Sequence, residues 1–166
     1  MLRIAVIGLG DISNIHLPVI NENPNVSLVA VCDIDERQKD MVPDATFYTN
    51  YEDMLDNEKL DCVHICLPHY LHDEATTACV KRGVHVLQEK PLALNLEESL
   101  ALLQLEEEHQ DVKICICFQN RYNATVVKLR EIVASGKYGE IKGIKGLVTW
   151  FRPKSYYDAK SWRAKK

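Results

Sequence analysis

Three short stretches of this 166-residue chain carry polar residues directly after apolar, β-branched runs. They are the glycine turn Gly8–Ser13, the single carboxylate Asp33 and the tripeptide Glu89-Lys90-Pro91. A glycine turn that opens a helix can bind a phosphate, and a carboxylate at a strand end can accept hydrogen bonds from a ribose. A lysine can stabilise the charge that develops on an alcohol oxygen during oxidation. Together they predict a site at the carboxyl ends of parallel strands.

The glycine turn has the order strand, turn, helix that binds a pyrophosphate. Gly8 lets the chain turn sharply, and Gly10 lets the backbone approach the phosphates without an intervening Cβ atom. Asp11 and Ile12 open the next helix, where unpaired N–H groups favour an anion. Ser13 replaces the third glycine of the usual fingerprint but is also small. A turn that serves only tight packing is the alternative.

Asp33 ends the apolar run Val26–Cys32, about 20 residues after the glycine turn, where a ribose-binding acid is expected. Its carboxylate could accept hydrogen bonds from both adenosine ribose hydroxyls and would repel a 2′-phosphate. The position therefore predicts NAD rather than NADP, although nearby Arg37 leaves NADP open. The alternative is that Asp33 only caps a helix expected at Asp35–Met41.

Strand and helix patterns alternate along the first 120 residues, with no hairpin signal between them. This order predicts an α/β fold with a doubly wound parallel sheet, the Rossmann fold, over residues 1–120, with strand order 3-2-1-4-5-6. The expected strands are Leu2–Ile7, Val26–Cys32, Ala45–Tyr48, Asp61–Leu67, Val84–Gln88 and Val112–Phe118. The expected helices are Asp11–Asn21, Asp35–Met41, Tyr51–Asp56, His72–Arg82 and Leu96–His109.

The first of these helices carries a conflict within its own pattern. Ile12, Ile15 and Val19 have the spacing of a buried face. Pro18 lies inside the same stretch and cannot donate a backbone hydrogen bond to Asn14. We therefore expect a kink or an early end of the helix at that point.

Composition and charge exclude several classes of protein. The net charge of −4 gives no general basic surface for nucleic acid, and no apolar run approaches the ~20 residues that cross a membrane. The N-terminus shows no signal-peptide pattern, so a cytoplasmic protein is expected. Six cysteines in such a protein are expected to be small buried hydrophobes.

One row of residues superficially resembles a metal site, namely Cys62-x-x-x-Cys66-x-x-His69-x-x-His72. Cys62 and Cys66 would lie about 13 Å apart on one strand at ~3.3 Å per residue, too far to share an ion. We expect no metal site. His64 falls inside the same apolar strand and is expected to be a satisfied core histidine.

Three longer stretches resemble the glucose–fructose oxidoreductase / inositol dehydrogenase / MocA family. They are Leu67–His72, Gly83–Leu94 and Phe118–Asn123, whose order and spacing agree with the family across about residues 1–150. The resemblance implies an NAD(P)-dependent oxidoreductase that transfers a hydride between a nicotinamide and a secondary alcohol, often on a sugar or polyol. A small-molecule substrate of that class and a homo-oligomer are the expected partners.

The resemblance also assigns roles to individual residues. It implies that Glu89 hydrogen-bonds the nicotinamide ribose, and that Lys90 reaches that ribose and the substrate hydroxyl as the catalytic group. The residues that it assigns to the cofactor are Gly8, Gly10, Asp11, Ile12, Asp33, Leu67, Pro68, His72, Glu89, Lys90 and Gln119. Pro91 would fix the backbone that aims Lys90, so we predict a cis Lys90–Pro91 bond.

Residues 121–166 are expected to form the first helix, Asn123–Ser135, and the first strand, Glu140–Phe151, of an incomplete α+β substrate or oligomerisation domain. The family's Asp-x-x-x-His element is absent, and no histidine follows His109. The activity of the chain by itself is therefore in doubt, and residues 140–166 are expected to pair with another copy or to be poorly ordered.

Two other interpretations stay open at this point. One is a non-catalytic dinucleotide-binding or regulatory module. The other is a nucleotide-dependent enzyme of another type, such as a methyltransferase, against which Glu89-Lys90-Pro91 counts.

Overall fold

The computed structural model describes residues 1–158. The chain divides into two compact units, Met1–Phe118 and Gln119–Lys166. We describe each unit by itself. No helix among the described residues is both long enough and apolar enough to cross a membrane.

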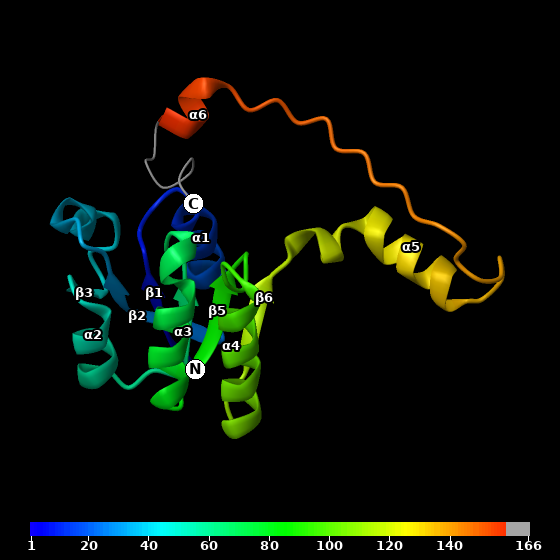
Figure 1. Ribbon diagram of the computed structural model, residues 1–166. Helices are drawn as coiled ribbons and strands as arrows, with labels where there is room; N and C mark the ends of the chain where they lie inside the picture. Colours follow the sequence, from blue (N-terminus) through cyan, green and yellow to red (C-terminus); the bar gives the residue numbers. More distant parts are fainter. Residues whose placement is uncertain (159–166) are drawn as a thin grey trace. The chain divides into compact units, whose positions relative to one another are not determined.

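The first unit is built on one parallel sheet of six strands (Figure 1). The strands are β1 (Leu2–Ile7), β2 (Val26–Cys32), β3 (Thr46–Tyr48), β4 (Cys62–Ile65), β5 (His85–Glu89) and β6 (Ile114–Cys117). Their order is β3-β2-β1-β4-β5-β6, which confirms the predicted topology and the Rossmann fold. The order reverses between β1 and β4, so the glycine turn after β1 lies at the switch point of the sheet.

The two faces of the sheet receive different helices because side chains alternate along each strand. Ala5 and Ile7 pack on the face of α2 (Tyr51–Asn57), α3 (His72–Lys81) and α4 (Leu96–Glu108). Ile4 and Val6 pack on the opposite face with α1 (Ser13–Glu22), through residues such as Leu17 and Ile20. Cys115 on β6 is exposed, so the expectation that all six cysteines are buried is wrong there.

The structure contradicts two parts of the prediction for α1, the early end and the buried face, and the predicted kink at Pro18 stays a prediction. The helix does not end early, since it continues past Pro18 to Glu22. Its buried residues are Ser13, His16, Leu17 and Ile20, whereas Ile15 and Val19 are more than 60% exposed. The helix turns a face with two polar residues toward the sheet, and an argument from apolar spacing alone selects the wrong face.

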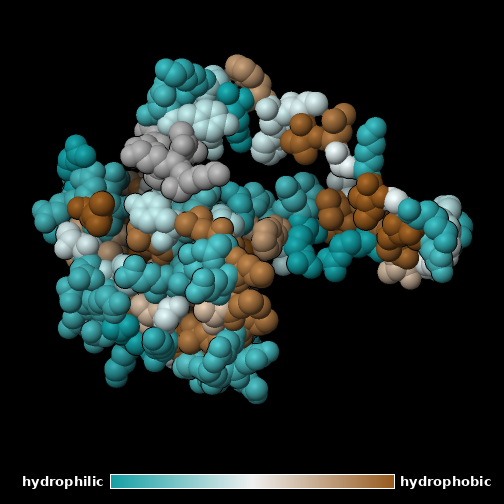
Figure 2. Space-filling view, viewed as in Figure 1, coloured by the Kyte–Doolittle hydropathy of each residue, from teal (hydrophilic) through white to brown (hydrophobic). Residues whose placement is uncertain are grey.

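The second unit contains α5 (Ala124–Ala134) and the short helix α6 (Lys154–Asp158). Figure 2 shows hydrophobic side chains at the surface of α5, and they include Val127, Leu129, Ile132 and Val133. The expected strand Glu140–Phe151 is wrong, because residues 141–153 form no helix or strand. A strand needs a neighbour for its ladder, and this unit supplies none among residues 119–158. The end of the stretch predicted to pair or disorder, residues 159–166, lies outside the described residues.

Candidate functional site

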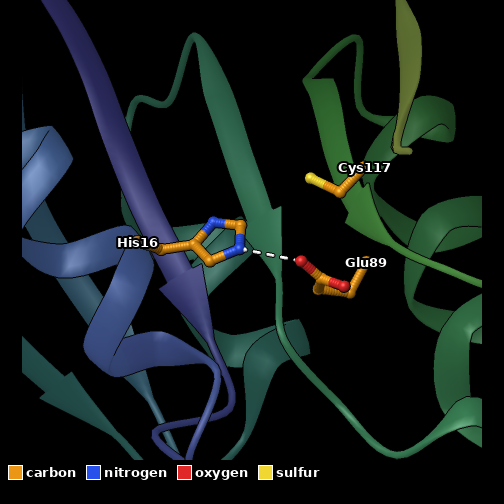
Figure 3. Close-up of side chains that lie close together, drawn as sticks. All are labelled: His16, Glu89 and Cys117. Atoms are coloured by element: carbon orange, nitrogen blue, oxygen red, sulfur yellow. Dashed lines mark hydrogen bonds and ion pairs between the residues drawn. The ribbon is translucent and has the colours of Figure 1, made fainter. Parts of the chain in front are cut away.

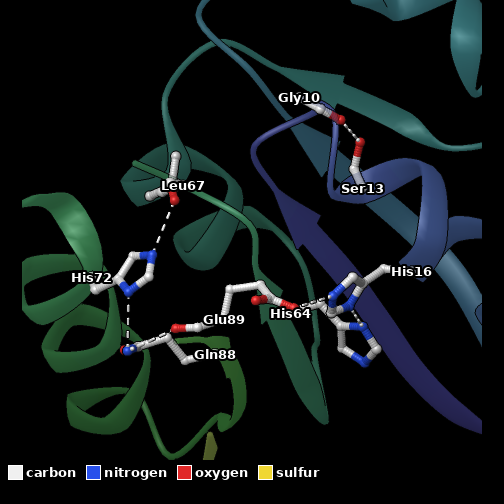
Figure 4. Close-up of polar contacts among 8 residues, drawn as sticks. All are labelled: Gly10, Ser13, His16, His64, Leu67, His72, Gln88 and Glu89. Carbon is white, nitrogen blue, oxygen red and sulfur yellow. Dashed lines mark hydrogen bonds and ion pairs between the residues drawn. The ribbon is translucent and has the colours of Figure 1, made fainter. Parts of the chain in front are cut away.

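The glycine turn is fixed to both neighbouring strands. Gly8 adopts a φ of +93° and donates its N–H to the Cys32 carbonyl at 2.8 Å. On its other side Gly8 lies against the residue that follows β4, because a Cβ atom on Gly8 would stand 2.7 Å from the Cys66 carbonyl oxygen. Ser13 is fully buried, and its hydroxyl donates to the Gly10 carbonyl at 2.6 Å (Figure 4). Ser13 therefore does the packing that the third glycine of the fingerprint would do.

The residues Gly10, Asp11 and Ile12 form the turn that leads into α1. Ile12 occupies the N-cap position, and no side chain there hydrogen-bonds the first turn of the helix. The Ser13 N–H donates to the Gly10 carbonyl at 3.2 Å and the Ile15 N–H to the Ile12 carbonyl at 2.9 Å, and the positive end of the helix dipole still favours a negatively charged group here. This end of α1 therefore fits a pyrophosphate.

Asp33 ends β2 beside this turn. Its Oδ2 accepts the Leu9 N–H at 2.7 Å, and its Oδ1 accepts the Asp35 N–H at 2.9 Å. The following helix, Glu36–Met41, is a 3₁₀ helix whose N-cap is Asp35, so the alternative that Asp33 caps it is wrong. Each oxygen of Asp33 keeps a further lone pair for a ribose hydroxyl.

Arg37, the residue that left NADP open, is engaged locally. Its guanidinium donates to both oxygens of Asp35, at 2.8 Å and 2.7 Å. The hydrogen bonds from Arg37 lower the pKa of the Asp35 carboxyl to about 2. The cation is therefore paired with a carboxylate beside the adenosine end of the site.

The predicted residues at the ends of β4 and β5 divide into two groups. Leu67 and Pro68 are partly exposed at the end of β4. His72 is fully buried, with its Nδ1 2.8 Å from the Pro91 carbonyl and its Nε2 3.0 Å from the Leu67 carbonyl. His72 thus links the segments that follow β4 and β5 by contacting a carbonyl group of each. Because its side chain is fully buried, it has no exposed surface for a ligand.

Gln88, which the sequence argument missed, supports the same loop. Its side chain is fully buried, and its Nε2 donates to the Pro91 and Leu92 carbonyls at 2.9 Å and 2.8 Å. Its Oε1 accepts the Thr76 hydroxyl at 2.5 Å. The Lys90–Pro91 bond between these anchors is cis, as predicted. Gln88 and His72 therefore hold the backbone on both sides of Lys90.

Replacing Gln88 by leucine should destabilise the first unit. The change leaves the Leu92 carbonyl and the Thr76 hydroxyl without their partner, while the Pro91 carbonyl keeps its contact with His72. Each unsatisfied buried group costs about 1–3 kcal/mol, so we expect the free energy of unfolding to fall by about 3 kcal/mol. Urea denaturation followed by circular dichroism measures the loss. Gln104→Leu on the exposed face of α4 is the matched control and should change stability by less than about 0.5 kcal/mol.

Glu89 is buried at the end of β5 and is held from α1 and β6. Its Oε1 lies 3.2 Å from the Nε2 of His16, and the ligand atoms of His16, Glu89 and Cys117 lie within 4.8 Å of one another (Figure 3). His16 in turn contacts His64, which is partly buried and whose Nδ1 lies 3.0 Å from the Nδ1 of His16. His16 was missed because it interrupts an apolar pattern, yet its position one turn after Ser13 was the signal available.

Lys90 follows Glu89 at the same strand end and is exposed in the first unit. It faces His69, whose pKa is lowered by burial, by His72 and by the charge of Lys90. Gln119 begins a 3₁₀ helix of the second unit, Gln119–Tyr122, so its role toward the nicotinamide stays a prediction.

The sequence of this chain is similar to those of known proteins. Residues 2–118 match the family GFO_IDH_MocA, described as an oxidoreductase family with an NAD-binding Rossmann fold. Inositol 2-dehydrogenase of Corynebacterium glutamicum is 28% identical over 88% of this chain and 45% of its own length. Myo-inositol 2-dehydrogenase of Thermotoga maritima is 31% identical over 84% of this chain and 42% of its own.

A solved structure is similar along nearly the whole chain. The WlbA dehydrogenase of Chromobacterium violaceum, in complex with NADH and UDP-GlcNAcA, has a TM-score of 0.92 and 32% identity. The match covers 98% of this chain and 48% of that one. The chain thus spans less than half the length of these relatives. The match over residues 2–118, together with the sheet order and the glycine turn, shows that the chain belongs to the Gfo/Idh/MocA oxidoreductase family with its NAD-binding Rossmann fold.

Proposed function

We propose that this chain supplies the NAD-binding part of an oxidoreductase that transfers a hydride between a nicotinamide and a secondary alcohol. The observation that carries the proposal is the convergence of three groups on one edge of the sheet. The uncapped start of α1, the carboxylate of Asp33 and the pair Glu89-Lys90 all follow strands in the same unit. This edge is where parallel α/β sheets bind their ligands.

Each group has a separate task in this proposal. The first N–H groups of α1 bind the pyrophosphate, and Asp33 binds the adenosine ribose. Glu89 accepts from the nicotinamide ribose, and Lys90 donates a hydrogen bond to the alcohol oxygen while the hydroxyl proton passes to water and the hydride passes to NAD⁺. NAD, when bound, supplies the hydride acceptor. The exposed ammonium of Lys90 stabilises the developing alkoxide, and in this way the protein lowers the activation free energy of the reaction.

The substrate class is a polyol or sugar. Two relatives named above are inositol dehydrogenases, and the solved structure of the WlbA dehydrogenase contains the nucleotide sugar UDP-GlcNAcA. We further propose that the protein acts in the cytoplasm as a homo-oligomer, and the six thiols, all free of disulfides, support that compartment.

The direct test is to titrate the chain with NADH, following nicotinamide fluorescence, and then to assay reduction of NAD⁺ at 340 nm with cyclic polyols and sugars. We expect saturable NADH binding by this chain, and turnover of one alcohol class by the oxidoreductase to which it contributes the NAD-binding part. Absence of NADH binding by the folded chain would falsify the proposal. Binding without turnover of any alcohol would instead favour a dinucleotide-binding module.

The same titration checks the role of Asp33. We expect the wild-type chain to bind NADH at least tenfold more tightly than NADPH, because the 2′-phosphate would stand against this carboxylate and Arg37 is paired with Asp35. Asp33→Asn keeps the size of the side chain and removes the charge, so the preference should shrink to a few-fold. Asp44→Asn, an exposed change in the following loop, is the control and should leave the ratio unaltered. A wild-type chain that prefers NADPH contradicts the prediction.

A further inference from the structure

A chain of buried polar contacts runs beneath the site, from β4 through α1 to β5. The Nδ1 of His64 lies 3.0 Å from the Nδ1 of His16, and the Nε2 of His16 lies 3.2 Å from the Oε1 of Glu89 (Figure 4). His16 and Glu89 are each 8% exposed. All three residues belong to the first unit, so their geometry does not depend on the second.

The positions of the protons in this chain follow from what each atom can do. A carboxylate oxygen only accepts, so the Nε2 of His16 must carry the proton in that contact. The Nδ1 of His16 faces the Nδ1 of His64, so one of the two rings donates in that contact and the other accepts. Burial, followed by the coulombic interaction with His16, lowers the pKa of His64 to about 4, so His64 is neutral near pH 7 and has one ring nitrogen that donates and one that accepts. Every contact then has one donor and one acceptor.

Glu89 is oriented from its other side by Cys117. Burial and the charge of Glu89 raise the pKa of the Cys117 thiol to about 11, so the thiol stays protonated and donates to the carboxylate. The polar atoms of His16, Glu89 and Cys117 lie within 4.8 Å of one another (Figure 3). Protons bridge this cluster and satisfy it, while the carboxylate retains lone pairs for a further donor.

We propose that His16 is a positioning residue for the nicotinamide half of the cofactor, and this rests on the proposed function. His16 holds the Glu89 carboxylate in the orientation that accepts from the nicotinamide ribose, and the contact with His64 fixes the His16 ring from its other nitrogen. His16 lies one turn after Ser13 on the helix whose start binds the pyrophosphate. One helix therefore sets the pyrophosphate and the ribose acceptor at a fixed separation.

Two amide variants separate the two nitrogens of the ring. The amide nitrogen of glutamine stands near the place of Nε2, so His16→Gln keeps the donor to Glu89 and loses the contact with His64. The amide of asparagine stands near the place of Nδ1, so His16→Asn keeps the His64 contact and loses the donor. We expect His16→Gln to bind NADH within about threefold of wild type, and His16→Asn to bind it about tenfold or more weakly.

ADP distinguishes positioning from a general structural effect, because it lacks the nicotinamide ribose. Both variants should bind ADP within about twofold of wild type, as measured by calorimetry on the same preparations. His64→Leu removes the partner of the His16 Nδ1 with His16 intact, and it should weaken NADH binding and leave ADP binding unchanged in the same way. This third variant carries the test if His16→Asn does not fold.

The outcomes are separable. Equal NADH affinity of the two amide variants, or an equal loss of NADH and ADP affinity in His16→Asn or His64→Leu, overturns the positioning role of His16. A wild-type chain that binds ADP but not NADH, or neither nucleotide, overturns the proposed function and this inference with it. A wild type that binds both, with the selective loss described, supports both.

Discussion

Lys90→Met is expected to lower kcat for alcohol oxidation by about 10²–10⁴-fold, the range that a positioned proton donor or acceptor contributes. Methionine retains the length of the side chain and removes its charge and its donors. The affinity for NADH should change by less than about tenfold, because the pyrophosphate and adenosine ribose are bound by the start of α1 and by Asp33. Steady-state kinetics at 340 nm, combined with a fluorescence titration, separate the two effects.

The control for Lys90→Met is Lys113→Met, a change at the amino ends of the strands. Lys113 is exposed and immediately precedes β6, so it lies far along the strands from the carboxyl ends. This variant should match the wild type in both kcat and NADH affinity. A Lys90→Met enzyme with unchanged kcat, or one whose whole defect disappears at saturating NAD⁺, contradicts the assignment of Lys90 as the catalytic group.

Gly8→Ala is expected to reduce the free energy of unfolding more than any other single change in the glycine turn. The φ of +93° is a conformation that costs a residue with a side chain about 1–3 kcal/mol. The added Cβ atom would also stand 2.7 Å from the Cys66 carbonyl oxygen, which is backbone directly after β4 and cannot rotate away. We expect a total loss of about 3 kcal/mol or more in urea denaturation, with NADH binding lost in parallel.

Gly83→Ala isolates the contribution of the clash. Gly83 also has a positive φ, +74°, at the end of α3, but a Cβ atom there would meet nothing within 4 Å. Its substitution should cost only the backbone term of about 1–2 kcal/mol. If the two alanine variants are destabilised equally, the close approach of Gly8 to Cys66 has no energetic weight.

The sequence was sufficient for the fold of the first unit. The bounds of β1 and β2 agree residue for residue with the structure, because each is an apolar run that ends at a glycine or a carboxylate. The strand order followed from the alternation of strands and helices, since a right-handed crossover leaves few other arrangements. The stretch Glu140–Phe151 shows the limit of this logic. Its pattern is apolar, but a strand also needs a partner that its own sequence does not specify.

The sequence predicted the residues at the strand ends of the candidate site but not the buried residues that hold them in position. Asp33 and Glu89-Lys90 could be placed because strand ends carry ligand-binding groups. The roles of His16 and Gln88 depend on which buried atoms meet, and a linear pattern does not contain that information. His72 was assigned to the cleft, yet its ring is enclosed by the carbonyls of Leu67 and Pro91. A buried polar residue in an apolar pattern was the sign that a contact of this kind existed.

The strand order also bears on how the chain folds while it is being synthesised. β2 and then β3 add to one side of β1, after which β4, β5 and β6 add in turn to its other side. Each strand that leaves the ribosome can therefore join an edge that is already formed, and none has to be inserted between two paired strands. The carboxyl-end groups arrive in the same sequence, with the glycine turn and Asp33 assembled first. The ribosome has to release β5 before Lys90 can meet them.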